Sequence, residues 1–478
     1  MSVSIWRKLL KDSAIYGGAD FFSKLLSFIF FPLMARYISV TEFGAMELIF
    51  TIIGLLGVIV NVGLNNAVQR FYWDKDTPES SRPVIVSSAL LVQVVAGLVV
   101  MLLGAAAVVS YGAVVGWEGQ SFDGRVLLFA LVFMAVSQWI QFALDVLRLH
   151  FRPWRFFALS ILSRVSGLLL AAWLVIQMGA RLDGILGAQA LVAVLVLPLA
   201  LALISKDLVL GVSLAWVKTL VAFGYPFIFA AFAYWIFGAI DRWMLASMSS
   251  VEEVGIYSVA FRFSSVVLFV SMAFGQAWSP VAMKIRTENP EGYRRIFATV
   301  LLALFMAMAL VGGGVALFSG EGIALLLPEE YQGSAAVLIP LCLGVVLQAT
   351  QQVTAVGISI ERKSHLIAKI SWCAVAVNVL LNLWLIPLFG ALGAAWATAV
   401  TYLFMTATYL AFTQYLHPLD ISWGRLLTAG VAVMGLFGVA LLARQTELAF
   451  SVIILKCFAL AVFCGIGAFV LPLKKVLS

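Results

Sequence analysis

The sequence predicts an all-α polytopic membrane protein with about 14 transmembrane helices, and three observations carry this prediction. Of 478 residues, 63% are hydrophobic and only 11% are charged, against about 25% charged in soluble domains, so too little polar surface exists to cover a water-soluble globule. Apolar runs recur along the whole chain, and most reach the roughly 20 residues that a membrane-crossing helix needs. The runs are apolar on all faces, which excludes the alternating strands of a membrane barrel.

The apolar runs define fourteen spans. The basic segment 1–12 leads into a full-length span without a small-residue cleavage pattern, so we expect a retained first helix and not a removed signal peptide. The predicted spans are 13–38, 45–65, 83–110, 122–147, 156–178, 184–204, 218–240, 254–277, 295–318, 333–356, 366–388, 391–414, 425–443 and 450–471.

The charge distribution predicts the orientation of these spans. The net charge is +7, but the basic residues lie in short loops at alternate helix ends, which indicates membrane topology and not nucleic-acid binding. With the N-terminus inside, 21 basic residues fall on the cytoplasmic side and 5 outside, namely Arg36, Arg125, Arg181, Arg242 and Arg444. We therefore predict a multi-pass membrane protein with both termini in the cytoplasm.

Several kinds of chemistry have no motif in this sequence. The four cysteines lie in apolar runs without CxxC spacing and the three histidines are far apart, so neither a disulfide framework nor a metal site is predicted. No GxxxxGK[ST], HExxH or GxSxG motif occurs. The loops are too short to hold a catalytic domain. We expect no catalytic residues and no cofactor.

An internal repeat predicts two lobes. LDGILGA begins at Leu182 and LFGALGA at Leu388, 206 residues later, and the same offset relates Arg36 to Arg242. Six spans separate the copies, so the halves should have parallel topology. The predicted domains are an N-lobe (1–205), a cytoplasmic linker (206–217), a C-lobe (218–415) and two further spans (416–478). The segment 205–218 is amphipathic, and it either lies along the inner membrane surface or is a plain loop.

Charged residues inside the spans are candidates for cargo binding. They are Asp20, Lys24, Arg164, Arg262 and Lys456, and Asp20 is the only deep carboxylate that this placement of spans contains. A charge at the helix centre costs about 2.5–3.5 kcal/mol, so each should face the bundle interior or water. Lys24, Arg164 and Arg262 would form a cationic series suited to phosphate oxygens. Alternatively, each pairs with a carbonyl or a distant acid.

Amides and outer charges supply the remaining candidates. Asn65, Gln69 and Gln351 lie in or at the ends of spans, where amides suit sugar hydroxyls but also serve as ordinary interhelical hydrogen bonds. Arg36 and Arg242 each close the first span of a lobe, and we place both at the outer mouth, with Arg242 tied to Asp241.

Several segments resemble one family of transporters. They are YGGADFFSKLLSFIFFPLMARYIS with EFGAMELIF, GLNNAVQRFY, and FGYPFIFAAFAYWIFGAIDRWML with VGIYSVAFRF. These segments are similar to the O-antigen and exopolysaccharide flippases (Wzx type) of the polysaccharide transport family, and the resemblance covers the whole chain. That family belongs to the superfamily of the multidrug and toxin extrusion exporters and the lipid II flippase.

The resemblance implies a fold, a cargo and a location in the bacterial cytoplasmic (inner) membrane. The fold would be two pseudo-symmetric six-helix lobes in a V shape around a cavity, plus two C-terminal helices that offer a groove to a polyprenyl tail. The cargo would be an undecaprenyl-pyrophosphate-linked oligosaccharide for lipopolysaccharide or exopolysaccharide synthesis, with a polysaccharide polymerase and glycosyltransferases as partners besides membrane lipid. Lys24 and Arg262 resemble two cavity cations of the lipid II flippase. Lysine in place of arginine at the first position weakens a bidentate phosphate contact there.

Two alternatives stay open at this point. One is an ion-coupled drug or metabolite antiporter of the same superfamily, against which the cationic candidates argue. The other is a membrane enzyme acting on polyprenyl-linked sugars, such as a polymerase or ligase. Such enzymes usually carry a long outer loop with catalytic residues, and none is predicted here.

Overall fold

The computed structural model describes residues 17–18, 22–23, 25–116, 123–361, 363–444 and 450–471. Within these ranges, twelve helices are long and apolar enough to cross a membrane, which confirms the predicted all-α polytopic fold. The α-helices are α2 (Val40–Asn61), α3 (Leu64–Tyr72), α4 (Arg82–Val114), α5 (Gly124–Leu149), α6 (Pro153–Met178), α7 (Leu182–Leu203), α8 (Leu214–Met248), α9 (Val251–Glu288), α10 (Tyr293–Leu317), α11 (Ser319–Leu326), α12 (Ser334–Ala349), α13 (Gln351–Thr354), α14 (Val356–Ile360), α15 (Ser364–Leu416), α16 (Trp423–Leu442) and α17 (Phe450–Val470); the short 3₁₀ helices are η1 (Glu79–Ser81), η2 (Ser205–Asp207) and η3 (Glu329–Tyr331).

Two features account for the difference between twelve helices and fourteen predicted spans. The spans predicted at 366–388 and 391–414 both lie in the 53 residues of α15, which is two helices joined at a kink. The kink is at Gly390, whose φ of 55° and ψ of −132° suit only glycine. The span predicted at 13–38 falls partly outside the described residues, and a shorter apolar helix, Leu25–Met34, lies in its described part.

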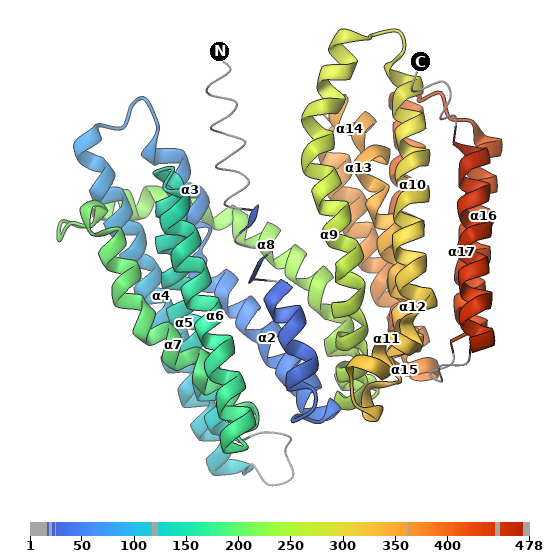
Figure 1. Cartoon of the computed structure of the whole chain (residues 1–478). Coiled ribbons are helices and arrows are strands. Elements are labelled where there is room, and N and C mark those ends of the chain that lie inside the picture. The colour runs from blue at the N-terminus through green and yellow to red at the C-terminus, as the bar shows by residue number, and fades with distance from the viewer. Residues whose placement is uncertain are drawn as a thin grey trace. The chain divides into compact units, whose positions relative to one another are not determined.

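The chain divides into two compact units, Met1–Ala239 and Ile240–Ser478. In the first unit, α5 contacts α2, α4, α6 and α7, and α7 also packs on α6 (Figure 1). Phe142 and Leu147 of α5 are buried in one apolar cluster with Ile85 of α4 and Leu159 of α6. Helix α5 is therefore the centre of the first unit.

The first part of α8 packs on the first unit. The ring of Phe223 lies 5.4 Å from that of Phe71, and Trp235 Nε1 donates to the carbonyl oxygen of Thr51 at 2.7 Å. A Cβ on Gly63 would clash with the backbone of Gly224, and a Cβ on Gly224 would clash with the carbonyl oxygen of Val62, so the two segments cross at glycines. The linker predicted at 206–217 precedes these contacts, whereas the units divide later, within α8.

The segment between α7 and α8 is a loop beyond the short η2 helix. Its backbone is held by α4, because the amide nitrogens of Val209 and Ser213 donate to the hydroxyls of Ser87 and Ser88 at 2.8 and 3.2 Å. Leu210 is fully exposed. The amphipathic segment is therefore not a surface helix, and its backbone hydrogen bonds fix it to α4.

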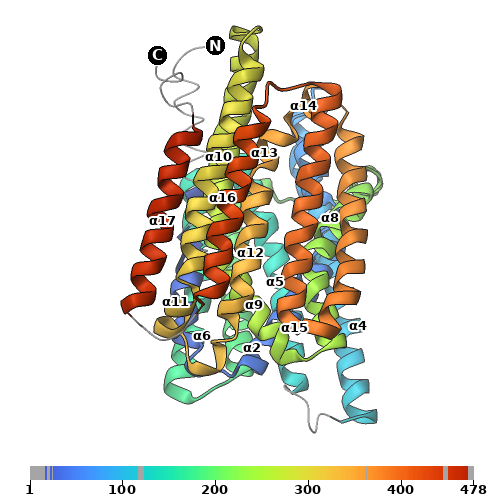
Figure 2. The same ribbon diagram turned by 90° about the vertical axis from the view of Figure 1, so that its right-hand side faces the viewer.

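In the second unit, α12 occupies the centre. It contacts α9, α10, α15 and α16, and most of its residues are buried. Helix α16 packs on α10 and α17, and Figure 2 shows these three helices next to one another. The two C-terminal helices therefore attach to the second unit mainly through α10.

A buried ion pair joins α17 to α11. Lys456 Nζ lies 2.6 and 2.8 Å from the two carboxylate oxygens of Glu321, and Lys456 is completely buried. The ammonium group also lies 5.8 Å from the centre of the Phe318 ring. The sequence places the charge of Lys456 inside the last span. Its counterion lies on α11, the short helix that follows the C-terminal end of α10.

In each unit, one helix begins with the same type of N-cap. Ser39 precedes α2 and Ser250 precedes α9, and the local sequences are SVTE and SVEE. Each serine hydroxyl accepts a hydrogen bond from the backbone nitrogen three residues later, that of Glu42 at 3.3 Å and that of Glu253 at 3.2 Å. This N-cap satisfies a backbone donor that the helix itself leaves unpaired.

The capping glutamates also contact equivalent junctions. Glu42 Oε1 lies 2.6 Å from Nε of Arg181, directly before α7. Glu253 Oε2 accepts from the backbone nitrogen of Ala391 at 2.5 Å, directly after the kink in α15. These junctions hold the two copies of LxGxLGA, so the repeated sequence occupies the same place in each unit.

A tyrosine–histidine–carboxylate cluster ties helix ends in the first unit. His150 Nε2 lies 2.8 Å from Asp207 Oδ1 and 3.3 Å from the hydroxyl of Tyr72. The three residues follow or end α5, α7 and α3. The cluster therefore fixes three helix ends on the side that the charge distribution predicts to be cytoplasmic.

The second unit has the same cluster with the histidine and the acid exchanged. Tyr293 Oη lies 2.6 Å from His417 Nε2, and His417 Nδ1 lies 3.1 Å from Glu361 Oε1. In the order of helices within each unit, Glu361 takes the place of His150 and His417 takes the place of Asp207. The repeat thus includes polar contacts as well as small residues.

We expect Lys456→Met to destabilise the second unit by about 3 kcal/mol, because it leaves the Glu321 carboxylate buried without its counterion. Lys456→Met combined with Glu321→Gln should recover most of this loss, since no isolated charge remains. Thermal unfolding of the purified full-length protein measures both. A double variant no more stable than Lys456→Met alone would contradict this reading of the pair.

Candidate functional site

The first unit contains a carboxylate held by amides. Asp145 of α5 accepts hydrogen bonds from Asn65 Nδ2 at 2.5 Å and from Gln141 Nε2 at 3.2 Å. Gln93 of α4 donates in turn to Asn65 Oδ1 at 3.3 Å. This network links α3, α4 and α5, and it fixes the orientation of Asn65.

A cavity of about 300 Å³ opens beside this network. Its polar lining combines the carboxylate with amides and one cation, since Arg148 Nη1 lies 3.8 Å from Asp145 Oδ1. Asn66 and Gln69 are exposed, so their amides are accessible to a ligand, and Arg148 is exposed beside Asp145. The polar residues of the lining are Asn61, Asn65, Asn66, Gln69, Asp145 and Arg148.

A second cavity, of about 350 Å³, contains Arg164 of α6. Gln138 and Gln141 of α5 and Gln189 of α7 line it together with Ser27 and Ser163. A third cavity, of about 240 Å³, shares Gln138 with the second and Asn61 and Asn66 with the first. The three cavities are therefore neighbours, and we call their polar lining the amide surface.

The amide surface suits a ligand with many hydroxyls and an anionic group. Side-chain amides both donate and accept, as sugar hydroxyls require. Arginine offers a planar set of donors that matches phosphate oxygens. Arg164 and Arg148 lie in different cavities of this surface, which would allow contacts at two points of an extended ligand.

The second unit contains a closed cluster of polar side chains around Asp241. The carboxylate accepts from Tyr257 Oη at 2.7 Å, Thr398 Oγ1 at 2.9 Å and Asn382 Nδ2 at 2.6 Å. Asn382 Nδ2 also donates to Asn378 Oδ1 at 3.0 Å. Asp241, Tyr257, Asn382 and Thr398 are all buried, so this cluster joins α8, α9 and the two parts of α15.

Arg242, which follows Asp241 in the sequence, contacts two residues of α9. Its Nε donates to Ser258 Oγ at 3.0 Å, and its guanidinium carbon lies 5.1 Å from the centre of the Phe261 ring. Arg242 is buried, whereas Arg36 is exposed. The two arginines related by the sequence repeat therefore have different surroundings.

The other predicted residues are more dispersed. Gln351 Nε2 donates to Thr406 Oγ1 at 3.2 Å, an interhelical contact with α15. Arg262 is partly buried and lines none of the cavities above. Lys24 lies outside the described residues. The first unit brings Asn65, Gln69 and Arg164 to the amide surface, and the cationic series stays a prediction.

Sequence reasoning missed several functional candidates. Asp145 and Asp241 both lie within helices and accept hydrogen bonds from side chains of other helices, but the sequence analysis did not single out Asp145. Asp20 lies outside the described residues, so the expectation that it is the only deep carboxylate stays a prediction. The boundaries of spans 122–147 and 218–240 placed both aspartates at or beyond helix ends. Gln141, four residues before Asp145 on the same helix face, was the available signal.

Two family models match this chain. A model of polysaccharide biosynthesis proteins matches residues 9–286, more than half of the chain. The MatE model matches residues 226–384. The two matches overlap in α8 and α9.

Two related proteins, each named as a flippase, align with most of this chain. Agl15 of Haloferax volcanii, named a probable low-salt glycan biosynthesis flippase, is 22% identical over 387 residues, which cover 80% of this chain and 79% of the relative. The lipid III flippase of Escherichia coli is 25% identical over 366 residues, which cover 74% and 85%.

Solved structures share the fold. The lipid II flippase MurJ in an inward closed conformation has a TM-score of 0.71 at 16% identity, covering 94% of this chain and 98% of that chain. A multidrug resistance transporter of the MATE family, in an inward-facing conformation, has a TM-score of 0.61 at 15% identity and covers 84% and 94%.

We expect Asp241→Ala to lower the free energy of unfolding by about 3 kcal/mol, because three buried donors lose their charged acceptor. Thr398→Val, which removes one donor, should cost about 1 kcal/mol. The matched control is Asp420→Ala, at an exposed carboxylate of the same unit. If thermal unfolding shows the same loss of stability for Asp241→Ala as for Asp420→Ala, the cluster does not stabilise the second unit and the prediction is wrong.

Proposed function

This chain belongs to the family of polysaccharide biosynthesis proteins, and on that premise we propose that it is a flippase of the multidrug, oligosaccharidyl-lipid and polysaccharide exporter superfamily. Its cargo would be an undecaprenyl-pyrophosphate-linked oligosaccharide repeat unit. The protein would move this unit from the cytoplasmic to the periplasmic leaflet by alternating access, for surface polysaccharide biosynthesis.

The observation that carries this proposal is the amide surface of the first unit. In a chain with only 11% charged residues, three neighbouring cavities collect amides, hydroxyls and two arginines. Polar side chains inside a membrane protein are costly and are typical of a pathway for a polar cargo. Amides would bind the sugar hydroxyls, and Arg164 would bind the pyrophosphate or an acidic sugar.

The energetics of the cargo favour this division of contacts. An oligosaccharide pyrophosphate does not cross hydrocarbon unaided, because burying its charges and hydroxyls without partners costs too much. A hydrated polar surface replaces the water of the headgroup, while the polyprenyl tail remains in lipid. The tail would run along α16 and α17, as the resemblance of the sequence implies.

The names of the relatives support the cargo class. A probable glycan biosynthesis flippase and a lipid III flippase are similar over most of this chain, and the lipid II flippase shares its fold. Relatives named as flippases favour a transporter over a membrane enzyme that acts on polyprenyl-linked sugars.

One observation favours a second candidate, an ion-coupled antiporter of the same superfamily. The Asp241 cluster places a carboxylate inside the second unit, where the MatE model also matches. Intramembrane carboxylates are the groups with which transporters exchange protons or cations. Under the main proposal this carboxylate would couple an ion gradient to flipping, whereas in an antiporter it would drive export of a small molecule.

We expect Arg164→Ala to slow flipping about tenfold or more, because one charged hydrogen bond to phosphate is worth about 1.5–3 kcal/mol. Arg164→Lys should retain part of the rate, since the charge remains. The assay is transfer of a fluorescent polyprenyl-pyrophosphate oligosaccharide across proteoliposomes that hold the purified protein. Arg262→Ala tests the cationic series in the same assay.

The matched control is Arg155→Ala, on the same helix as Arg164 and also exposed, but outside the cavities. It should flip at the rate of the unsubstituted protein. Equal rates for Arg164→Ala and Arg155→Ala would remove Arg164 from the site. Absence of flipping by the unsubstituted protein, with transport of small cations instead, would favour the antiporter.

A further inference from the structure

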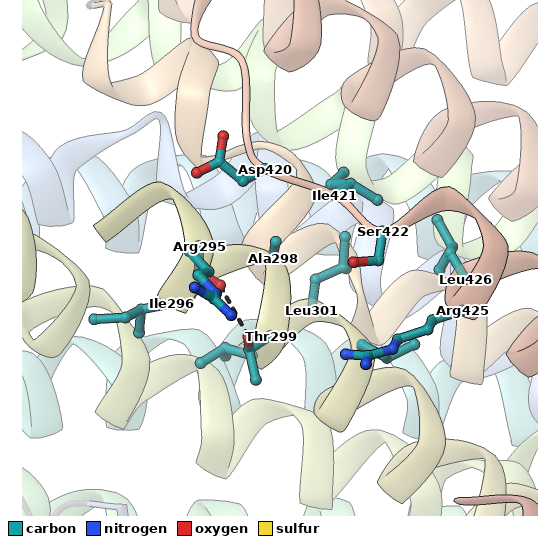
Figure 3. Close-up of a pocket in the computed structure, with 12 residues that line it drawn as sticks. Arg295, Ile296, Ala298, Thr299, Leu301, Asp420, Ile421, Ser422, Arg425 and Leu426 are labelled. Carbon is teal, nitrogen blue, oxygen red and sulfur yellow. Dashed lines mark hydrogen bonds between the residues drawn. The ribbon is translucent and has the colours of Figure 1, made fainter. Parts of the chain in front are cut away.

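The second unit contains a cationic cavity that the proposed function does not use. The cavity has a volume of about 540 Å³ and lies where α10 and α16 begin. Arg295 of α10 and Arg425 of α16 contribute their guanidinium groups to it (Figure 3). The positive N-terminal ends of two helices add to the potential of the two arginines. This end of the unit therefore attracts an anion.

The acid of this cavity does not neutralise the two arginines. Asp420 lies apart from Arg295 and Arg425 in Figure 3, and it interacts electrostatically with Arg294. Among the described residues of this unit, no carboxylate forms an ion pair within 4.0 Å of the Arg295 or Arg425 guanidinium. The two cations are therefore open to an external anion.

An apolar cavity continues from the cationic one. It has a volume of about 470 Å³, and Leu301 and Leu426 line both cavities. Its walls come from α10, α12, α15 and α16, with Leu347, Leu403 and Val433 among them. From Leu426 to Met434 the lining follows α16 for about 12 Å. A cation pair at a helix end thus opens into an apolar channel along the same helices.

This arrangement complements an amphiphile with an anionic head and a hydrocarbon chain. We propose that the two cavities bind one anionic glycerophospholipid, with its phosphate between Arg295 and Arg425 and an acyl chain in the apolar cavity. Basic pockets between membrane helices on the cytoplasmic side are typical binding places for anionic headgroups. The charge distribution of the sequence predicts that these arginines face the cytoplasm.

The lining favours a phospholipid over the proposed cargo. Among the residues that line the cationic cavity in the described part of the chain, none has an amide or an aromatic side chain. Thr299 and Ser422 supply the only hydroxyls. An oligosaccharide head would find few partners here, in contrast to the amide surface. A phosphate with a small polar head needs only the arginines and these hydroxyls.

The experiment titrates the delipidated full-length protein in detergent with phosphatidylglycerol and, separately, with phosphatidylcholine of the same acyl chains. Native mass spectrometry counts the bound lipid. We expect a clear preference for phosphatidylglycerol. Arg295→Gln with Arg425→Gln should weaken its binding about thirtyfold, because each arginine near an anionic lipid is worth about 1 kcal/mol. Lysine at both positions should keep most of the preference.

The charge control is Arg286→Gln with Lys363→Gln, which removes two exposed positive charges of the same unit outside both cavities. It should leave binding unchanged. The apolar cavity is tested with Gly430→Phe, because a side chain at Gly430 meets open space and enters the cavity. Gly435→Phe, on the same helix and equally unobstructed, is its control.

Loss of phosphatidylglycerol binding in Gly430→Phe, but not in Gly435→Phe, is the expected result. Equal binding of the two phospholipids, or equal losses in the test and control variants, would overturn the proposal. Undecaprenyl phosphate is a further probe, and its displacement of phosphatidylglycerol at equal concentration would assign the cavities to cargo and also overturn it. Binding and flipping are measured separately, so failure here leaves the proposed function untouched.

Discussion

The cost of placing polar groups in hydrocarbon shapes both units of this protein. Charges and amides inside the described spans must find partners or water. Lys456 and Glu321 form a buried ion pair, and the Asp241 carboxylate accepts three hydrogen bonds from three helices. Except for the bond from Tyr257, which joins the consecutive helices α8 and α9, these contacts join residues at least 135 positions apart in the sequence. The polar residues therefore determine which apolar helices pack together, because apolar surfaces alone are as well solvated by lipid as by one another.

The same constraint separates the roles of the two units. Around Asp241 the polar atoms are directed at one another and buried, so this cluster is closed to a large ligand. Around Asp145 the network is partly satisfied and opens into cavities, where Asn66 and Gln69 are exposed. A closed cluster suits structural coupling between helices or a small ion, whereas an open one suits a bulky polar cargo. This contrast is why the proposal assigns sugar contacts to the first unit.

Composition and run length predicted the spans well, because the requirement for about 20 apolar residues acts on every helix independently. The partners of the buried charges were not predictable in this way. Lys456 finds an acid 135 residues away, and the distance between them depends on tertiary packing. Asp145 was overlooked because a carboxylate near the end of an apolar run resembles a loop residue. At Gly390 the sequence predicted a break between two spans, 366–388 and 391–414. In the structure the two helices are joined directly at this glycine.

The exchange of histidine and acid between the two helix-end clusters explains how far a sequence repeat can be detected. LxGxLGA is visible because both copies keep the same small residues at the start of a helix, where a Cβ on Gly184, Gly390 or Gly393 would lie within 3 Å of a neighbouring atom. In the clusters the constraint acts on a pair, and a histidine and a carboxylate can trade positions without losing the contact between them. His150 with Asp207 and Glu361 with His417 join corresponding helix ends with different residues at each position, and different ring nitrogens face the acid in the two clusters. A comparison by residue identity therefore finds the small residues of a duplicated fold and misses its polar contacts, although both follow from the same packing of helix ends.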